Sequence, residues 1–416
     1  MATAEAVARR RSVRSAPALA LLAGGTSLAL LCVAVAAAHP EASPLSPDHA
    51  GGDTGWSWLF LGAAAGAFVL YLVGLGALSR GPARLRLVLA LACAIQLAPL
   101  VGPVLLSTDV YTYWARGRVG AVHGENPYRV APSRFPDDPA VARMGASWRD
   151  RPTGYGPGFT LVSEAHAAVV GESPAAASWL YRAIGGGSTL AVVGLAAFLG
   201  RRRSLAAAFV GWNPLLAVHF AGGGHNDALM MALVLAALAL ATHRRLDLAG
   251  AAWALAIAVK WVPLLFLPLR ALEARATGRP VRHAGFAAVA AVVAGLASWR
   301  YGSGWLESFP NFSGQLRRTT SLGAPSLLTG LGLSERVAIA LLAALFLVAY
   351  LWLLWEARRG RARLGLCAAL LLLTTSWLVP WYAIWAVPLA AIEEDRTARV
   401  LALGLCGYLL RGAVPL

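Results

Sequence analysis

The stretch STDVYTYWARGR, residues 107–118, holds the first side chains whose types and spacing could do chemistry. If the chain after Ser107 is helical, Asp109, Tyr113 and Arg116 fall at positions i, i+4 and i+7 and share one face. A carboxylate beside cations suits a general base in a reaction whose leaving group is a phosphate. The alternative is an aspartate that caps a helix at a membrane interface, within a belt of aromatic side chains.

A second polar group lies in GGGHNDALMM, residues 222–231. Its three glycines allow a sharp turn, which places His225, Asn226 and Asp227 at the mouth of the next apolar segment. Consecutive polar groups that enter an apolar helix are unfavourable unless they are paired or face water. Two interpretations stay open, an Asn-Asp helix cap and a functional site on the same side as Asp109.

Lys260, in AIAVKWVPLLFLPL, is the only lysine of the chain. A helix that begins near Asp247 would lift it about 20 Å, into the outer half of a bilayer. Pro263 follows shortly and is expected to end the helix. The sequence allows either snorkelling of the lysine to the interface or a buried ammonium that awaits an anionic partner.

The rest of the chain is the apolar frame that must position these residues. Its 416 residues are 58% hydrophobic and 13% charged, with a mean hydropathy of +0.61, whereas soluble domains carry about 25% charged residues. This composition predicts an all-α polytopic membrane protein with one integral domain over residues 1–416. The net charge of +16 comes from arginine clusters between apolar segments. That is the positive-inside pattern of cytoplasmic loops, so we expect a lipid bilayer as partner and no nucleic acid.

Eleven to thirteen crossings are expected, and they fix the sides of the loops. With the amino terminus in the cytoplasm, the acidic segment 39–55 falls outside and the arginine-rich segment 79–86 inside. The outer loops are then 107–177, which is large, and 299–323. The candidate crossings are 17–38, 56–78, 84–106, 178–200, 204–220, 228–242, 246–259 with 261–272 as a shorter pair, 282–298, 335–357, 361–378, 380–392 and 397–413.

The lengths of two apolar segments decide whether each crosses the membrane. Segment 158–171 would span only about 21 Å as a helix, short of the roughly 30 Å hydrocarbon core. We therefore expect it to be an amphipathic helix on the outer surface. Segment 17–38 is longer than the apolar core of a signal peptide, about 7–15 residues, so an uncleaved first helix is expected.

No metal-ligand spacing and no Walker A or Rossmann glycine pattern stands out. We therefore expect no cofactor, although the sequence leaves a divalent ion open. An ATP-driven transporter is disfavoured for the same reason.

The ordered motifs DVYTYWARGR, G-x-NPY, YGP, GHND, K-x-x-P and PWYAIW resemble one known family. They are similar to the polyprenol-phosphate-mannose-dependent α-1,6-mannosyltransferases of actinobacterial envelope synthesis, over about residues 105–390. This resemblance implies a membrane glycosyltransferase of the GT-C class, in the plasma membrane, with its active site outside the cytoplasm. It also implies inverting transfer of mannose from polyprenyl-phosphate mannose to a hydroxyl of an envelope mannan or glycolipid.

The resemblance also implies roles for particular residues. Asp109 would be the catalytic base. Gly158, in GYGPGF, and the arginine-rich region before it depart from the family pattern and leave the acceptor open. The donor and its phosphate would be bound by Lys260, Arg116, Arg118 and Tyr113, and the sugar or acceptor by His225, Asn226, Asp227, Tyr155, Arg317 and Arg318.

Two other functions remain alternatives. The chain could be a GT-C transferase for another lipid-linked sugar, such as arabinofuranose or glucose. It could also be a polytopic lipid or oligosaccharide transporter. A transporter places its ionisable residues near the bilayer midplane between repeated halves. Here they lie at the outer ends of helices and no repeat is apparent, which favours the transferase.

Overall fold

The computed structural model describes residues 2–311 and 318–416, with side chains from residue 15 onward. Every regular element in these ranges is an α-helix, a 3₁₀-helix or a π-helix. Apolar segments fold this way because hydrocarbon offers no partner for backbone N–H and C=O groups, so they bond within the segment. The prediction of an all-α polytopic membrane protein is confirmed.

Within the described ranges, five helices are long and apolar enough to cross a membrane. The bent pair Arg203–Gly211 and Pro214–Gly222, with 50° between its halves, makes a sixth. Four shorter apolar helices accompany them, so the expected number of eleven to thirteen crossings stays a prediction. The five long helices are α1 (Ala2–Ala36), α2 (Gly55–Arg80), α7 (Pro174–Leu199), α13 (Ala284–Tyr301) and α16 (Glu335–Arg358).

The shorter elements complete the chain and supply most of the polar residues. They are α3 (Leu85–Leu97), η1 (Ala98–Val101), α4 (Asp109–Ala121), η2 (Pro132–Arg134), α5 (Pro139–Arg143), η3 (Ala146–Trp148), α6 (Pro157–Val170), α8 (Arg203–Gly211), α9 (Pro214–Ala217), the π-helix η4 (Val218–Gly222), α10 (Asp227–Thr242), α11 (Leu246–Val259), η5 (Val262–Leu265), α12 (Phe266–Ala276), η6 (Gly304–Glu307), α15 (Ala324–Gly330), α17 (Leu364–Thr374), η7 (Pro380–Tyr382), α18 (Ala383–Glu393) and α19 (Arg396–Leu409).

The connections that carry arginine clusters meet at one end of the helices. Arg202, between α7 and α8, donates hydrogen bonds to the carbonyls of Leu78 and Ser79 at 3.0 and 2.7 Å. Arg363, between α16 and α17, pairs at 2.6 Å with Asp395, between α18 and α19. The loop before α8 thus contacts the end of α2, and the loop before α17 contacts the loop before α19; that all these loops share the cytoplasmic side stays a prediction.

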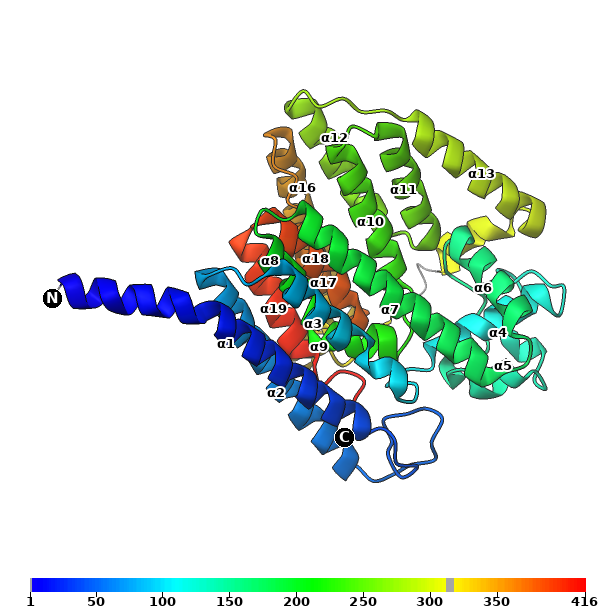
Figure 1. The fold of residues 1–416 in the computed structure, drawn as a ribbon. Helices are drawn as coiled ribbons and strands as arrows, with labels where there is room; N and C mark the ends of the chain where they lie inside the picture. Colours follow the sequence, from blue (N-terminus) through cyan, green and yellow to red (C-terminus); the bar gives the residue numbers. More distant parts are fainter. Residues whose placement is uncertain (1, 312–317) are drawn as a thin grey trace.

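The segments predicted on the other side also contact one another. The backbone N–H of Leu106 donates to the carbonyl of Leu45 at 2.9 Å, and the side-chain amide of Asn126 donates to the carbonyl of Tyr301 at 2.8 Å. Figure 1 shows α4, α5 and α6 gathered at one end of α7, at the lower right, while the connection between α12 and α13 runs along the top. The polar residues between α3 and α7 thus form one unit, which we call the α4–α6 unit (residues 107–173).

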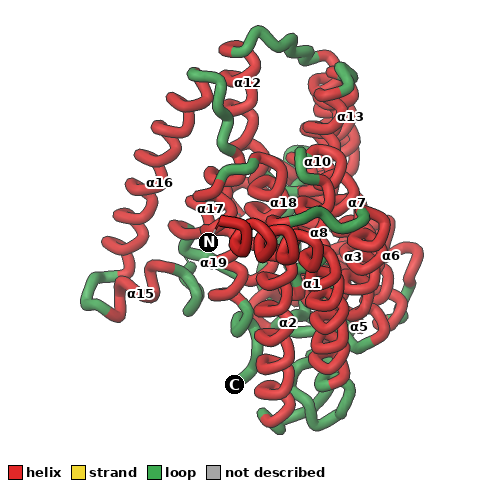
Figure 2. Tube along the Cα trace, turned by 60° about the vertical axis from the view of Figure 1, so that its left-hand side comes forward, coloured by secondary structure: helices red, strands yellow, loops and turns green. Residues whose placement is uncertain are grey.

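Two of the long helices have little protein around them. In their most apolar stretches α13 and α16 bury 11% and 17% of their residues, against 39–50% for α1, α2 and α7. Figure 2 shows α16 standing at the side of the molecule with α15 at one end. Because these exposed faces are apolar, we expect them to face lipid.

Helix α6 confirms the helix expected at 158–171. An amphipathic helix on a surface would turn its polar face to water and its apolar face inward, and α6 does the opposite. Its polar residues Glu164 and His166 are buried, whereas Val162 and Val169 are exposed. Glu164 turns inward because it pairs with Arg300 of α13 at 2.9 Å. Burial lowers the pKa of His166 to about 4, so this imidazole is neutral at neutral pH.

The α4–α6 unit is held by a close approach of two helix backbones. Gly117 of α4 lies against the carbonyl of Ser163 in α6, and Gly120 lies against the carboxyl group of Glu164. A side chain at either glycine would collide with these atoms, so the sequence ARGRVG lets α6 pack directly on α4. This contact fixes the direction of the helix that begins with Asp109.

Candidate active site

Asp109 is the first residue of α4, where its backbone N–H donates to the Ser107 hydroxyl at 3.1 Å. One turn further on, the Tyr113 hydroxyl donates to Oδ2 of Asp109 at 3.3 Å. The predicted shared face of these two residues is therefore confirmed. The carboxylate keeps 17% of its surface exposed, which leaves it open to a ligand.

His225 lies against this carboxylate. Its Nδ1 is 3.2 Å from Oδ2 of Asp109, at ion-pair distance but without the alignment of a hydrogen bond. The ring is fully buried and stacks on Trp381, with 3.7 Å between the ring centres. Its Nε2 faces Gly223. In this structure His225 is a partner of Asp109, and the sugar-binding role that the resemblance implied stays a prediction.

The surroundings of Asp109 keep it charged. Burial alone would raise the pKa of the Asp109 carboxyl, but His225, Lys260 and Arg116 together outweigh burial and hold the pKa below its ordinary value. The group is therefore a carboxylate at neutral pH. It can accept a proton and has cations nearby that favour an anionic partner.

Lys260 is buried and already paired. It follows α11 in an extended conformation, and its Nζ lies 2.7 Å from Oδ1 of Asp227. The indole N–H of Trp385 donates to the same oxygen at 2.6 Å, and the ammonium lies 4.6 Å from the centre of the Tyr382 ring. Of the two interpretations from the sequence, the structure shows the buried ammonium, with a carboxylate of the protein as its partner.

The turn before α10 presents polar atoms that have no partner among the described residues. Both amide atoms of Asn226 and Oδ2 of Asp227 are buried without a hydrogen bond. Asn226 stands at the position before the helix, yet its side chain makes no capping bond. The helix-cap interpretation therefore does not account for this side chain. Unpaired buried amide and carboxylate atoms are suited to bind hydroxyl groups.

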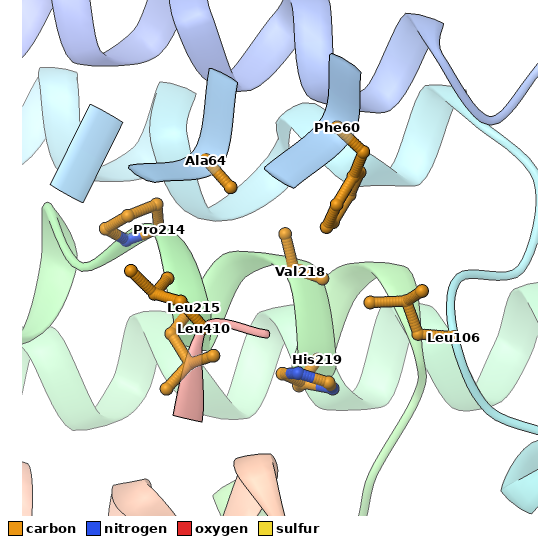
Figure 3. A pocket seen from close by; sticks show the side chains of 8 residues that line it. All are labelled: Phe60, Ala64, Leu106, Pro214, Leu215, Val218, His219 and Leu410. Carbon is orange, nitrogen blue, oxygen red and sulfur yellow. The ribbon is translucent and has the colours of Figure 1, made fainter. Parts of the chain in front are cut away.

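Local backbone structure brings this turn to α4. The π-helix η4 precedes it, and Gly224 has a positive φ of 68°. A Cβ at Gly224 would meet Val110 of α4, so glycine is needed both for the conformation and for the contact. Figure 3 shows a small pocket beside η4, between α2 and α9, in which Phe60, Val218 and His219 take part. Apart from His219 its lining is apolar.

The two arginines of α4 have different places. Arg116 is buried, and its guanidinium carbon is 5.7 Å from the ring centres of both Trp148 and Tyr155. Arg118 is instead in a buried ion pair with Asp138 at 2.8 Å, and it donates to the carbonyl of Gly171 at 2.8 Å. Arg118 therefore ties α5 and the end of α6 to α4, outside the group around Asp109.

Asp138 shows how firmly that structural pair is held. Burial raises the pKa of this carboxyl. The hydrogen bonds from Arg118 and from the backbone N–H of Ala140, together with the contact with His123, lower the pKa by more than burial raises it, so the net shift is downward. The carboxylate thus stays charged opposite Arg118. The placement of Arg118 gives it a role in folding and no open side from which to bind a donor.

The remaining predicted residues lie around Arg116. The ring of Tyr155 packs edge-on against Tyr113, with 5.3 Å between the centres. Arg318 lies over the rings of Trp148 and Trp377, at 5.3 and 5.5 Å. Arg317 lies outside the described residues.

The sequence analysis assigned no role to several residues that the structure places here. Trp381 and Trp385 lie in the quoted motif PWYAIW, so the resemblance contained a signal for them. Trp148 is the last residue of the short η3, and Arg151 lies in the irregular segment between η3 and α6, so no periodicity marks them.

Fold and site together define an all-helical membrane protein whose charged and aromatic residues meet at one end of the helices, as in an enzyme that acts at a membrane surface. The family described as "Alpha-(1->6)-mannopyranosyltransferase, N-terminal domain" matches residues 13–275. The MptB C-terminal domain matches residues 319–415. The chain therefore belongs to the α-(1→6)-mannopyranosyltransferase family of glycosyltransferases.

Individual relatives agree with this assignment. The chain is 29% identical to a probable α-(1→6)-mannopyranosyltransferase of Mycolicibacterium smegmatis, over 70% of this chain and 62% of the relative. It is 29% identical to α-(1→6)-mannopyranosyltransferase A of Mycobacterium tuberculosis, over 85% of this chain and 75% of the relative. A second M. tuberculosis α-(1→6)-mannopyranosyltransferase is 27% identical, over 73% and 65%. The chain thus spans about two thirds of the length of these relatives, and no solved structure matches it significantly.

The pair between Lys260 and Asp227 predicts strongly coupled effects on stability. Lys260→Met and Asp227→Asn should each lower the free energy of unfolding by about 3–5 kcal/mol, because each leaves a buried group without its partner. The double variant should lose clearly less than the sum. The measurement is unfolding of the purified proteins in detergent. The exposed pair of Arg129 and Glu307 (51% and 44% exposed) is the control. Breaking it should lower the free energy of unfolding by less than about 1 kcal/mol. Additive losses at Lys260 and Asp227 would contradict the coupling.

Proposed function

We propose that the protein transfers mannose from polyprenyl-phosphate mannose to a hydroxyl of an envelope mannan or glycolipid, forming an α-1,6 linkage. The family supports the sugar and the linkage. The observation that carries the chemistry is the ionised, partly exposed carboxylate of Asp109, which has cations nearby and contacts His225, the residue before the unpaired polar atoms of Asn226 and Asp227. The donor, the acceptor class and the inverting course are parts of the proposal.

In the proposed reaction Asp109 is the general base. As the acceptor oxygen attacks the anomeric carbon, Asp109 takes the proton from that hydroxyl. The bond between the anomeric carbon and the phosphate oxygen breaks on the opposite face, which inverts the configuration. The electron pair leaves with the polyprenyl phosphate, and the proton on Asp109 passes to water after the product departs.

The turn before α10 supplies the contacts for the sugar. The amide of Asn226 and the free oxygen of Asp227 can each bind a mannose hydroxyl. Lys260 and Trp385 hold Asp227 through its other oxygen. The aromatic rings of Tyr113 and Tyr155 offer apolar surface beside Asp109.

Lys260 and Arg116 differ in what they can offer to the donor phosphate. Arg116 has no carboxylate within ion-pair distance among the described residues, and its Nε has no acceptor, so its guanidinium is available to an anion. Lys260 would have to leave Asp227 before it could contact the phosphate. Lys260 therefore acts on the reaction by positioning Asp227 and by its positive charge near Asp109.

We also propose that this site faces the outside of the plasma membrane. The α4–α6 unit lies at the opposite end from the arginine-rich connections, and such connections are retained in the cytoplasm. A lipid donor in the outer leaflet would then reach Asp109 without crossing the membrane.

Sidedness can be tested with single introduced cysteines. Arg134→Cys, at an exposed position in the α4–α6 unit, should react with a membrane-impermeant maleimide in intact cells. Arg279→Cys, between α12 and α13, should react only after permeabilisation, and the unmodified chain gives the background from its own cysteines. The reverse pattern would place Asp109 on the cytoplasmic side.

Replacing the proposed base should abolish transfer. Asp109→Asn should lower kcat about 10²–10⁴-fold, the usual contribution of a positioned general base. The assay is mannose transfer by the protein in liposomes, from polyprenyl-phosphate mannose to a short mannoside. Asp137→Asn, which removes an exposed carboxylate of the same unit, should leave kcat unchanged. An Asp109→Asn variant with a tenth or more of the normal rate would show that the base lies elsewhere.

The pH dependence should report the partnership of Asp109 and His225. Because the pKa of Asp109 is held below its ordinary value of 3.8, the carboxylate persists as the pH falls, and kcat/KM should decline only below about pH 4. His225→Gln removes the first of the groups that lower this pKa, so the acid limb should move to higher pH. The measurement is kcat/KM against pH for both proteins. A uniform loss of rate at every pH would mean that His225 acts through structure alone.

A further inference from the structure

Three arginines from different segments surround a single indole. The guanidinium carbons of Arg116, Arg151 and Arg318 lie 5.7, 6.0 and 5.3 Å from the centre of the same ring of Trp148. Arg116 comes from α4, Arg151 from the irregular segment before α6, and Arg318 from the second outer loop. The three segments are far apart in the sequence, so the fold itself gathers these charges.

None of the three arginines has a carboxylate partner among the described residues. Four other arginines of this end, Arg118, Arg129, Arg143 and Arg300, each pair with an acidic side chain. Arg116 is only 5% exposed, and its Nε has no hydrogen-bond acceptor. A buried guanidinium group with an unused donor is unfavourable unless a ligand satisfies it.

The three charges also repel one another. Burial is the largest effect that lowers the pKa of Arg318, and the neighbouring Arg151 lowers it further. Burial likewise lowers the pKa of Arg116; Tyr155, Asp109 and Tyr113 oppose that shift, and Arg151 adds to it. Like charges gathered with no carboxylate at ion-pair distance among the described residues are the arrangement expected of an anion site before its ligand binds.

The shape of the group favours phosphate. Each guanidinium offers a fork of N–H donors that matches two oxygens of a phosphate group. Trp148 and the neighbouring Trp377, 5.9 Å apart between centres, add an apolar wall on which the first units of a lipid chain can lie.

We propose that Arg116, Arg151 and Arg318, arranged around Trp148, form the site that binds the phosphate of a lipid phosphate. This inference rests on the proposed function, in which the leaving group is a polyprenyl phosphate. The donor is a phosphodiester with one negative charge, whereas the leaving group is a monoester with a charge of nearly two at neutral pH. A site with three free cations therefore stabilises the charge that develops as the bond breaks more than it stabilises the donor.

The phosphate could come from the donor lipid or from the head group of an anionic phospholipid or glycolipid. The two sources share their chemistry at the arginines, and they differ in the rest of the molecule. Binding of farnesyl phosphate, a short isoprenoid monoester, tests the first source. Binding to vesicles with and without phosphatidylglycerol tests the second.

The first measurement is equilibrium binding of radiolabelled farnesyl phosphate to the full-length protein in detergent, with farnesol as the competitor that lacks phosphate. Arg151→Gln and Arg318→Gln should each weaken binding about tenfold or more, the loss expected for one charge-assisted contact. Arg151→Lys keeps the charge but loses the fork, so it should bind between the wild type and Arg151→Gln. Arg134→Gln removes an exposed arginine of the same unit and should bind normally.

The outcomes separate this site from the proposed reaction. Weaker binding of farnesyl phosphate, together with a lower kcat for transfer, supports the site and names the donor as its ligand. Normal binding of farnesyl phosphate with lost binding to phosphatidylglycerol vesicles supports the site and names the head group as the source. If Arg151→Gln and Arg318→Gln change neither, the arginines do not form a phosphate site. Because binding is measured without transfer, a wild type that transfers no mannose but binds farnesyl phosphate through these arginines would refute the reaction and keep the site.

Discussion

The buried ion pair between Lys260 and Asp227 is the interaction on which the polar end of this molecule depends. It joins the residue that follows α11 to the first residue of α10, and Trp385 of α18 bonds the same carboxylate oxygen. Since α10 begins at Asp227, the pair also fixes the turn that holds His225 against Asp109. A charge in an apolar interior is tolerated only when it is matched. Pairing within the protein therefore orders three helices and leaves one oxygen of Asp227 free for a ligand.

The need to match a buried charge with a partner also distinguishes three groups of arginines. Those in the connections at the far end bond backbone carbonyls and acidic side chains of neighbouring loops, and so they bind the helix ends to each other. Arg118 and Arg300 are matched by carboxylates within the α4–α6 unit or beside it. Around Trp148, three arginines from different segments are gathered without a carboxylate partner in the part of the chain that the structure describes. Where the fold leaves cations unmatched, it leaves room for the charge of a ligand.

The sequence predicted the fold and part of the site. It succeeded where neighbours along one helix decide the arrangement and failed where contacts between distant segments decide it. Helical periodicity placed Asp109 and Tyr113 on one face, since residues four apart are neighbours on any α-helix. Periodicity places Arg118, two residues after Arg116, about 200° around the helix, but it did not show that Asp138 lies on that side. The amphipathic surface helix expected at 158–171 gave no sign that Glu164 would turn inward, because its partner Arg300 lies more than a hundred residues later. Trp148 ends the three-residue η3 and Arg151 lies in the irregular segment after it, so no helical or strand pattern could single them out.

The single lysine of the chain gives the molecule an intrinsic reporter. Apart from the amino terminus, Lys260 Nζ is its only primary amine, and it lies against Asp227 and over the Tyr382 ring. A ring face shifts the magnetic resonance of nearby nuclei strongly, and a buried amine reacts slowly with acylating reagents. Isotope-labelled methyl groups on this nitrogen would therefore give one resolved signal from the side chains around Asp227. That signal would sense the movement of a substrate past Asp227 without any substitution in the sequence.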